Sequence, residues 1–120
     1  MIFLNNFLIY NNFMNFNLRE EYSLKKYMPS KTSLNSMSTF FYAFSDDTRL
    51  KIIILLTIKP LCVSEITSVL EINQTTISHQ LKILKSIDIV DCDRFGKNVI
   101  YYIKNGNIEN VLNATVECLN

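Results

Sequence analysis

The chain has 120 residues and a formal net charge of +1, with 48% apolar and 19% charged residues. This length and apolar content suit one small domain with a single core plus an extension, and the near-zero charge excludes a bulk polycation. Only 2 glycines and 2 prolines are present, which favours helices with short connections over a many-stranded sheet.

Residues 1–37 differ from the rest of the chain, and we interpret them as an N-terminal extension of a domain at residues 38–120. Residues 1–16 are apolar at roughly helical spacing, but asparagines interrupt them, and a later charged stretch ends at a break near Pro29. No basic segment and no uninterrupted apolar run of about 18 residues is found, so we expect no signal peptide, no membrane span and a cytoplasmic protein. Three interpretations stay open: a helical arm that packs on a dimer partner, a weakly ordered tail, and a start codon assigned too early, because three later methionines are candidate starts.

From residue 38 the apolar pattern becomes regular and predicts two helices. Residues 39–44 hold phenylalanines at helical spacing, and the polar run at residues 45–48 is rich in N-cap residues. The next helix, residues 48–58, is apolar around most of its circumference, which predicts a central place in the core, and Pro60 follows its end. Its most continuous apolar face is Leu50, Ile53, Ile54 and Ile58.

Two further helices are predicted, joined by a turn of about three residues, which is the spacing of a helix-turn-helix. Ser64 is expected to cap the first of them, and Asn73 caps the second, at residues 73–86. The expected inward residues are Ile66, Val69 and Leu70 on the first helix and Ile77, Leu81 and Leu84 on the second.

After residue 86 the apolar period changes from helical to alternating. Residues 87–93 and 99–103 are predicted strands, and the turn between them, residues 94–98, contains glycine and asparagine, as hairpin turns do. A last helix is predicted at residues 108–119. A hairpin directly after the second helix of a helix-turn-helix describes a winged helix, so the predicted fold is mainly α with a small β-hairpin.

The second helix of this pair is the predicted DNA-reading helix. At about 100° per residue, its hydroxyl, imidazole and ammonium side chains fall on one arc beside the buried stripe, and residues 73–87 contain no Asp or Glu. Such groups suit base edges and phosphates in the major groove, and a basic wing tip suits the phosphate backbone. The candidate DNA contacts are Gln74, Thr75, Thr76, Ser78, His79, Lys82 and Lys85 on the helix and Arg94, Gly96, Lys97 and Asn98 on the wing.

These residues predict a sequence-specific DNA-binding transcriptional regulator whose partner is double-stranded DNA. The alternative is a winged helix that serves as a protein-interaction or dimerisation module, which the charge of −1 on residues 37–120 leaves open. An enzyme is not expected, because there is no phosphate loop, no nucleophile beside a base and no evident acid pair.

Four stretches resemble the ArsR family of small dimeric bacterial repressors, in the right order and spacing. Residues 45–50 resemble the family's A-D-P-T-R-L, residues 61–66 its E-L-C-V-C-D-L, residues 74–82 its recognition helix Q-S-T-V-S-H-H-L-K, and residues 96–102 its wing G-R-x-V-Y-Y. The resemblance implies a homodimer formed by the first and last helices. It also implies binding to an inverted repeat and release by an effector, namely a metal ion, arsenite or a thiol-reactive species.

The family's metal-binding positions are largely replaced in this chain. Where some members place two thiolates one residue apart, only Cys62 remains and Ser64 takes the second place. Where others place carboxylate and imidazole ligands on the last helix, the chain has Asn105, Asn107 and Cys118. We therefore predict no certain cofactor and no confident metal site; a metal ion stays open as an alternative, with Cys62 as a ligand at best.

The scattered cysteines form no disulfide framework and leave one sensing alternative open. Cys62 and Cys118 are candidate thiol sensors, whereas Cys92, on a predicted strand, is expected to be structural. A milder departure is Asp88, which stands where many members have glycine and which tolerates the left-handed backbone conformation.

Overall fold

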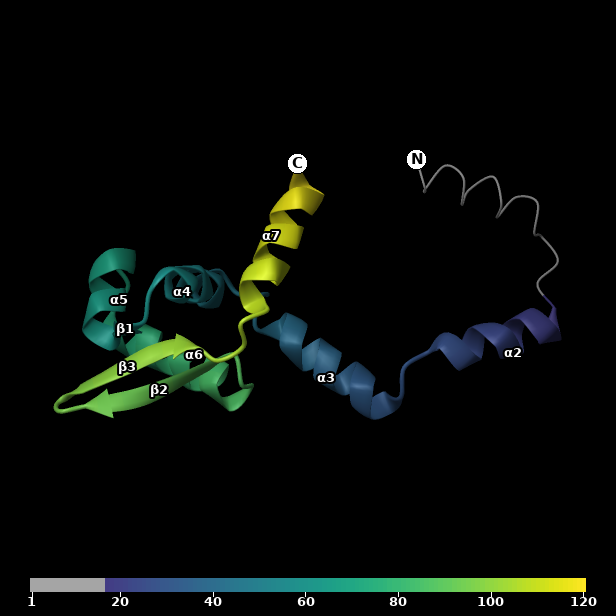
Figure 1. The fold of residues 1–120 in the computed structure, drawn as a ribbon, viewed down its shortest axis with the longest axis horizontal. Helices are drawn as coiled ribbons and strands as arrows, with labels where there is room; N and C mark the ends of the chain where they lie inside the picture. Colours follow the sequence, from purple (N-terminus) through teal and green to yellow (C-terminus); the bar gives the residue numbers. More distant parts are fainter. Residues whose placement is uncertain (1–16) are drawn as a thin grey trace. The chain divides into compact units, whose positions relative to one another are not determined.

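The computed structural model describes residues 17–120, and its contacts divide the chain into two compact units, Met1–Leu34 and Asn35–Asn120. The apolar segment at residues 1–16 lies outside the described residues. Across residues 17–120, no helix has the length and apolar character needed to cross a membrane. The elements in chain order are α2 (Leu18–Tyr27), α3 (Lys31–Tyr42), α4 (Asp47–Ile58), β1 (Leu61–Cys62), α5 (Val63–Leu70), α6 (Gln74–Ser86), β2 (Val90–Phe95), β3 (Asn98–Ile103) and α7 (Ile108–Leu119) (Figure 1).

The first unit contains α2, a polar helix with a well-formed start. The side chain of Asn17 accepts hydrogen bonds from the backbone N–H groups of Arg19 and Glu20, and the Glu20 carboxylate accepts one from the Asn17 N–H. This capping box satisfies N–H groups that have no partner inside the helix. The helix ends at Tyr27, just before the break that the sequence predicts near Pro29.

The helix at the start of the domain is longer than its phenylalanines predict. It runs from Lys31 to Tyr42 instead of occupying residues 39–44, and Ala43 and Phe44 follow in a turn. The backbone N–H of Ala43 bonds to the carbonyl of Phe40, a tightened i to i−3 contact that ends the helix. Ala43 is fully buried, so the turn itself belongs to the core.

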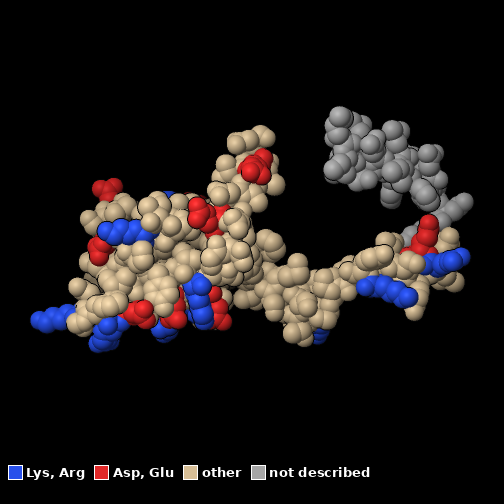
Figure 2. Space-filling view, in the orientation of Figure 1, with Lys and Arg blue, Asp and Glu red and all other residues tan. Residues whose placement is uncertain are grey.

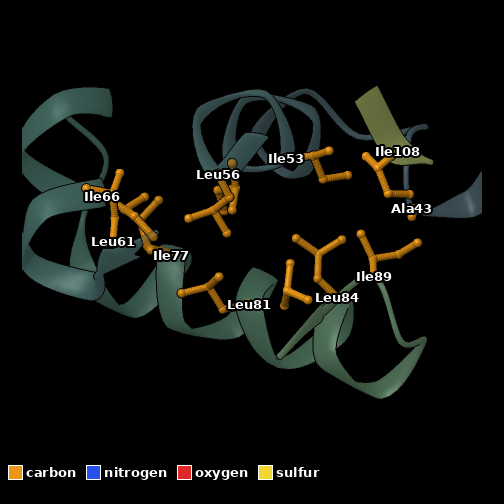
Figure 3. Packing of buried hydrophobic residues seen from close by; sticks show 12 residues of the cluster. Ala43, Ile53, Leu56, Leu61, Ile66, Ile77, Leu81, Leu84, Ile89 and Ile108 are labelled. Atoms are coloured by element: carbon orange, nitrogen blue, oxygen red, sulfur yellow. The ribbon is translucent and has the colours of Figure 1, made fainter. Parts of the chain in front are cut away.

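The core of the second unit lies between α4 and α6. In Figure 3, Ile53 and Leu56 of α4 point toward Leu81 and Leu84 of α6. Removing each such side chain from water contributes roughly 1.5–3 kcal/mol, so this contact is a main source of the fold's stability. The whole buried apolar cluster comprises Ala43, Ile52, Ile53, Leu56, Leu61, Ile66, Ile77, Leu81, Leu84, Ile89, Val90 and Ile108.

The predicted inward faces of α4 and α5 are partly wrong. Ile54 and Ile58 of α4 are exposed, as is Val69 of α5, whereas Ile52 is fully buried. A helix that is apolar nearly all round does not itself reveal which face is inward, because several stripes satisfy the helical period. The face of α6 is predicted correctly, since polar residues flank its apolar stripe.

The sheet has three strands in the order β1-β3-β2, one more than the predicted hairpin. Leu61 and Cys62 form β1 and pair antiparallel with Tyr101 and Ile100 of β3. A two-residue strand carries no periodic signal in the sequence. The hairpin β2–β3 turns at Gly96, whose φ of +61° is the left-handed conformation that glycine adopts without strain.

The strand predicted at residues 87–93 begins later, at Val90. Asp88 has a φ of +61°, so the left-handed conformation foreseen at this position is present. The backbone N–H of Ile89 bonds to the carbonyl of Leu84, which closes the end of α6 before β2 starts. Residues 87–89 therefore terminate a helix instead of forming a strand.

Candidate nucleic-acid interface

The two helices of the helix-turn-helix meet through a short, well-defined turn. Glu71, with a φ of 55° in the left-handed region, ends α5, and Asn73 starts α6 by accepting a hydrogen bond from the Thr76 N–H at 2.9 Å. The predicted cap of α6 is therefore correct. The predicted cap of α5 is wrong: α5 begins at Val63, and Cys62 rather than Ser64 is its N-cap residue, because β1 leads directly into the helix.

One exposed face of α6 carries most of the predicted DNA contacts. Its buried stripe is Ile77, Leu81 and Leu84, and no acidic residue lies between Gln74 and Ser86. Thr76 is half-buried and lies on the other flank of the helix, so it does not share this face. The exposed face consists of Gln74, Thr75, Ser78, His79, Lys82 and Lys85.

Lys85 links α6 to the wing. Its Nζ lies 3.3 Å from Sγ of Cys92 in β2, and this hydrogen bond, together with the partial negative charge of the sulfur, raises the pKa of Lys85. Its ammonium group is therefore held at the junction of helix and sheet. Cys92, expected to be structural, is half-buried and is the sulfur partner of this lysine.

The wing tip is basic and exposed. Arg94, Lys97 and Asn98 are exposed around Gly96, and Figure 2 shows Lys and Arg side chains at the outer end of the hairpin with acidic side chains behind them. The exposed acidic residue behind the tip, Asp93, confines positive charge to the end of the hairpin. Sequence reasoning missed the aromatic side chain between these residues, Phe95, which is 65% exposed.

A second missed residue is Arg49, the one charged residue that is buried within residues 17–120. It contacts α6 from the first turn of α4 through a hydrogen bond to Gln80. The sequence feature that could have indicated its burial is an arginine inside a helix that is otherwise apolar on nearly every side. Burying a charge in that position costs free energy that hydrogen bonds must offset.

The thiol of Cys62 lies beside a carboxylate. Sγ donates to Oε1 of Glu65 at 2.9 Å and also lies 3.1 Å from Oγ of Ser64. The hydrogen bond lowers the pKa of Glu65, which is exposed and charged at neutral pH. The thiol of Cys62 is therefore engaged in a hydrogen bond to a carboxylate.

The donors at the family's metal positions do not fit a soft or borderline metal ion. Among residues 17–120, no group of three or more His, Cys, Asp or Glu side chains is arranged to hold one. Near Cys62 the set is one sulfur, one hydroxyl and one carboxylate, whereas soft metals require several sulfurs. At the start of α7, the amide oxygen of Asn105 accepts from the Asn107 N–H at 2.9 Å, and Cys118 lies exposed in the last turn.

Comparison with known proteins agrees with this architecture. Residues 46–91, which span α4, α5 and α6, match the family described as bacterial regulatory protein, arsR family. The chain is 40% identical over 82 residues to the cadmium resistance transcriptional regulatory protein CadC of Listeria innocua, covering 68% of this chain and 69% of CadC. It is 29% identical over 99 residues to a transcriptional repressor SmtB homolog of Synechocystis, covering 80% and 75% of the two chains.

Solved structures give the same result for the fold. The homodimeric winged helix-turn-helix DNA-binding domain of a possible ArsR-family regulator from Mycobacterium bovis superposes with a TM-score of 0.66 at 26% identity. That match covers 78% of this chain and 88% of the other. The order of helices, turn and wing is thus shared with a DNA-binding domain.

Proposed function

The chain belongs to the arsR family of bacterial regulatory proteins and is a DNA-binding transcriptional regulator, and we propose that it acts as a homodimeric repressor that reads an inverted repeat with α6. The observation that carries this proposal is the exposed face of α6, which presents amide, hydroxyl, imidazole and ammonium groups and no carboxylate. These groups are the complement of base edges and phosphates in the major groove.

The direct contacts follow from the chemistry of each side chain. Gln74, at the first turn, suits the paired donor and acceptor of adenine, and Lys82 suits a phosphate. Ser78 and His79 lie between them on the same exposed face. At the wing tip, Arg94 and Lys97 would contact the backbone beside the groove that α6 enters.

A dimer supplies a second α6 helix for the second half-site of an inverted repeat. Apolar side chains on α3 and α7 remain exposed in the single chain, among them Phe41 at 60% and Val116 at 57%. We propose that these two helices form the dimer interface, as the family resemblance implies. Two copies related by a two-fold axis present two α6 helices to successive major grooves, which an inverted repeat matches.

The proposal does not extend to a cadmium or zinc site at the family's positions, because the donors there do not fit. Cys62 and Cys118 remain predicted sites for a thiol-reactive effector, and Cys118 is the more exposed of the two. The proposed role is regulatory rather than enzymatic, and we place it in the cytoplasm, where the DNA is.

DNA binding is tested with an operator selected by the protein from a random pool of duplex DNA. We expect His79→Ala and Lys82→Ala each to weaken binding by about tenfold, the size of one good polar contact, while the dimer persists in gel filtration. Lys51→Ala is the matched control, since it removes an exposed lysine from α4 and should leave affinity within about twofold.

The alternative, a protein-interaction module, predicts a different outcome. If no operator is selected and no salt-sensitive DNA binding is found, the proposal is wrong and the exposed face of α6 has another use. If both α6 variants bind as tightly as the parent protein, α6 is not the reading helix.

A further inference from the structure

Arg49 occupies an unusual position in the core. Its side chain is 6% exposed, although it belongs to α4, whose neighbouring buried residues Ile52, Ile53 and Leu56 are aliphatic. Desolvating a guanidinium costs free energy that only good hydrogen bonds offset. Its Nε is buried without a partner, so the hydrogen bonds are made by the two terminal nitrogens.

Those two nitrogens contact different helices. Nη1 donates to Oε1 of Gln80 in α6 at 3.1 Å, and Nη2 donates to the carbonyl of Tyr42, the last residue of α3, at 2.9 Å. The guanidinium also lies over the Tyr42 ring, with 4.4 Å from Cζ to the ring centroid. One side chain therefore joins the end of α3 to the middle of α6.

The Tyr42 carbonyl is a fixed anchor for this link. It also accepts hydrogen bonds from Oγ of Ser45 at 2.8 Å and from the Ser45 N–H at 3.2 Å. Carbonyls at the end of a helix carry partial negative charge, which favours a cation. The partly exposed Asp46 carboxylate, 4.0 Å from Nη1, is a longer and weaker contact.

Gln80 is placed to control the rotation of α6 about its axis. It is half-buried, on the flank between the buried stripe and the solvent, and it directly follows the predicted DNA contact His79. Contacts between apolar side chains are not directional, whereas hydrogen bonds are. With side chains reaching about 5–6 Å from the helix axis, a rotation of about 10° displaces a base-contacting group by about 1 Å.

We propose that Arg49 is a positioning residue for DNA reading, which acts through Gln80 to fix the rotation of α6 and ties it to the end of α3. This inference rests on the proposed function, because it assumes that α6 reads DNA and that α3 belongs to the dimer interface. A planar guanidinium holds two acceptors in fixed directions, which an ammonium group on the same helix does not. The link therefore supports specific base contacts and the half-site spacing, and contributes little to contacts with phosphates of unrelated DNA.

The test compares Arg49→Met, Gln80→Met and the double variant, on the selected operator and on unrelated DNA, at a temperature where each variant is folded. We expect each single change to lower operator affinity by about tenfold and to leave binding to unrelated DNA within about twofold. The double variant should bind no more weakly than either single one, because both remove the same hydrogen bond. Lys51→Met is the matched control, as it removes a cation from the exposed side of α4.

A second readout separates positioning from simple destabilisation. The parent protein should bind an operator with one extra base pair between its half-sites much more weakly than the selected operator. Gln80→Met should show a smaller difference between the two affinities, because a helix free to rotate tolerates altered spacing. Gln80→Met carries the test even where Arg49→Met fails to fold. The inference is overturned if Gln80→Met has the operator affinity of the parent protein and the same difference in affinity between the two operators. It is also overturned if the affinity loss of the double variant equals the product of the two single losses. A parent protein that selects no operator contradicts the proposed function, and the inference falls with it.

Discussion

The region that would read DNA and the region that would sense an effector differ in how fully their side chains match the family resemblance. In α6, the buried stripe and the exposed polar face are both present, and no carboxylate interrupts them. Around Cys62 and just before α7, the backbone elements are equally regular, but the hydroxyl of Ser64 and the amides of Asn105 and Asn107 stand where the family resemblance implies metal ligands. Both regions are regular in backbone, and they differ in whether their side chains match the pattern that the family resemblance implies.

This contrast follows from what each region requires. A reading helix needs a packed face opposite an exposed one, a pattern that many residues jointly specify. A metal site needs a few ligands of the right type, and replacing one of them removes it without disturbing the backbone. A regular backbone near Cys62 is thus no indication of metal sensing, whereas the two faces of α6 together form the pattern that the proposed DNA reading requires.

The largest expected effect comes from breaking the packed side of α6. Leu81→Ala empties a fully buried site against α4 and should lower the free energy of unfolding by about 2–5 kcal/mol. Urea denaturation followed by circular dichroism measures this loss. Lys82→Ala, at the adjacent exposed position, is the control and should change stability by less than about 0.5 kcal/mol. Equal effects at both positions would mean that α6 is not packed as described.

A smaller effect is expected from restoring a ligand in the sensing region. Ser64→Cys places a second sulfur beside Cys62, since the present Oγ lies 3.1 Å from Sγ. We expect cadmium affinity to rise by about tenfold or more, because soft metals favour paired thiolates. Titration with cadmium, followed by sulfur-to-metal charge-transfer absorbance, measures it. Ser68→Cys adds an exposed thiol farther along α5, and if it binds cadmium as tightly, the backbone near Cys62 does not present a ligand pair.

The sequence was most informative where local chemistry decides the backbone. Asn73 as a helix cap, Gly96 at the hairpin turn and Asp88 in the left-handed conformation were all predictable, because each follows from the residue's own side chain. The inward stripe of α6 was predictable because polar residues border it. The order of the elements followed from the apolar pattern, and the family resemblance added the expected dimer.

Tertiary relations account for what the sequence did not reveal. The strand β1 exists because residues 61–62 meet β3, which no local pattern records. The choice of inward face on α4 depends on where α6 lies. The Arg49–Gln80 link joins residues that are 31 positions apart, and the Lys85–Cys92 contact depends on how the sheet returns along α6.

The smallest expected effect concerns the reactivity of Cys62, which distinguishes a silent thiol from a sensor. Because the thiol's hydrogen bond lowers the pKa of Glu65, the carboxylate is charged at neutral pH, and the bond is lost only as the pH falls through that lowered value. Removing the charge with Glu65→Gln should raise the rate of Cys62 alkylation at pH 7 by about two- to fivefold, since the sulfur then no longer donates its hydrogen bond to a negatively charged acceptor. Mass spectrometry of iodoacetamide-treated protein measures the rate at each cysteine. Glu71→Gln removes the same charge at the far end of α5 and should leave the rate unchanged. A Cys62 that reacts as fast as the exposed Cys118 before any substitution would mean that Glu65 does not protect it, and the sensing region would then retain the thiol chemistry that its other replacements have removed.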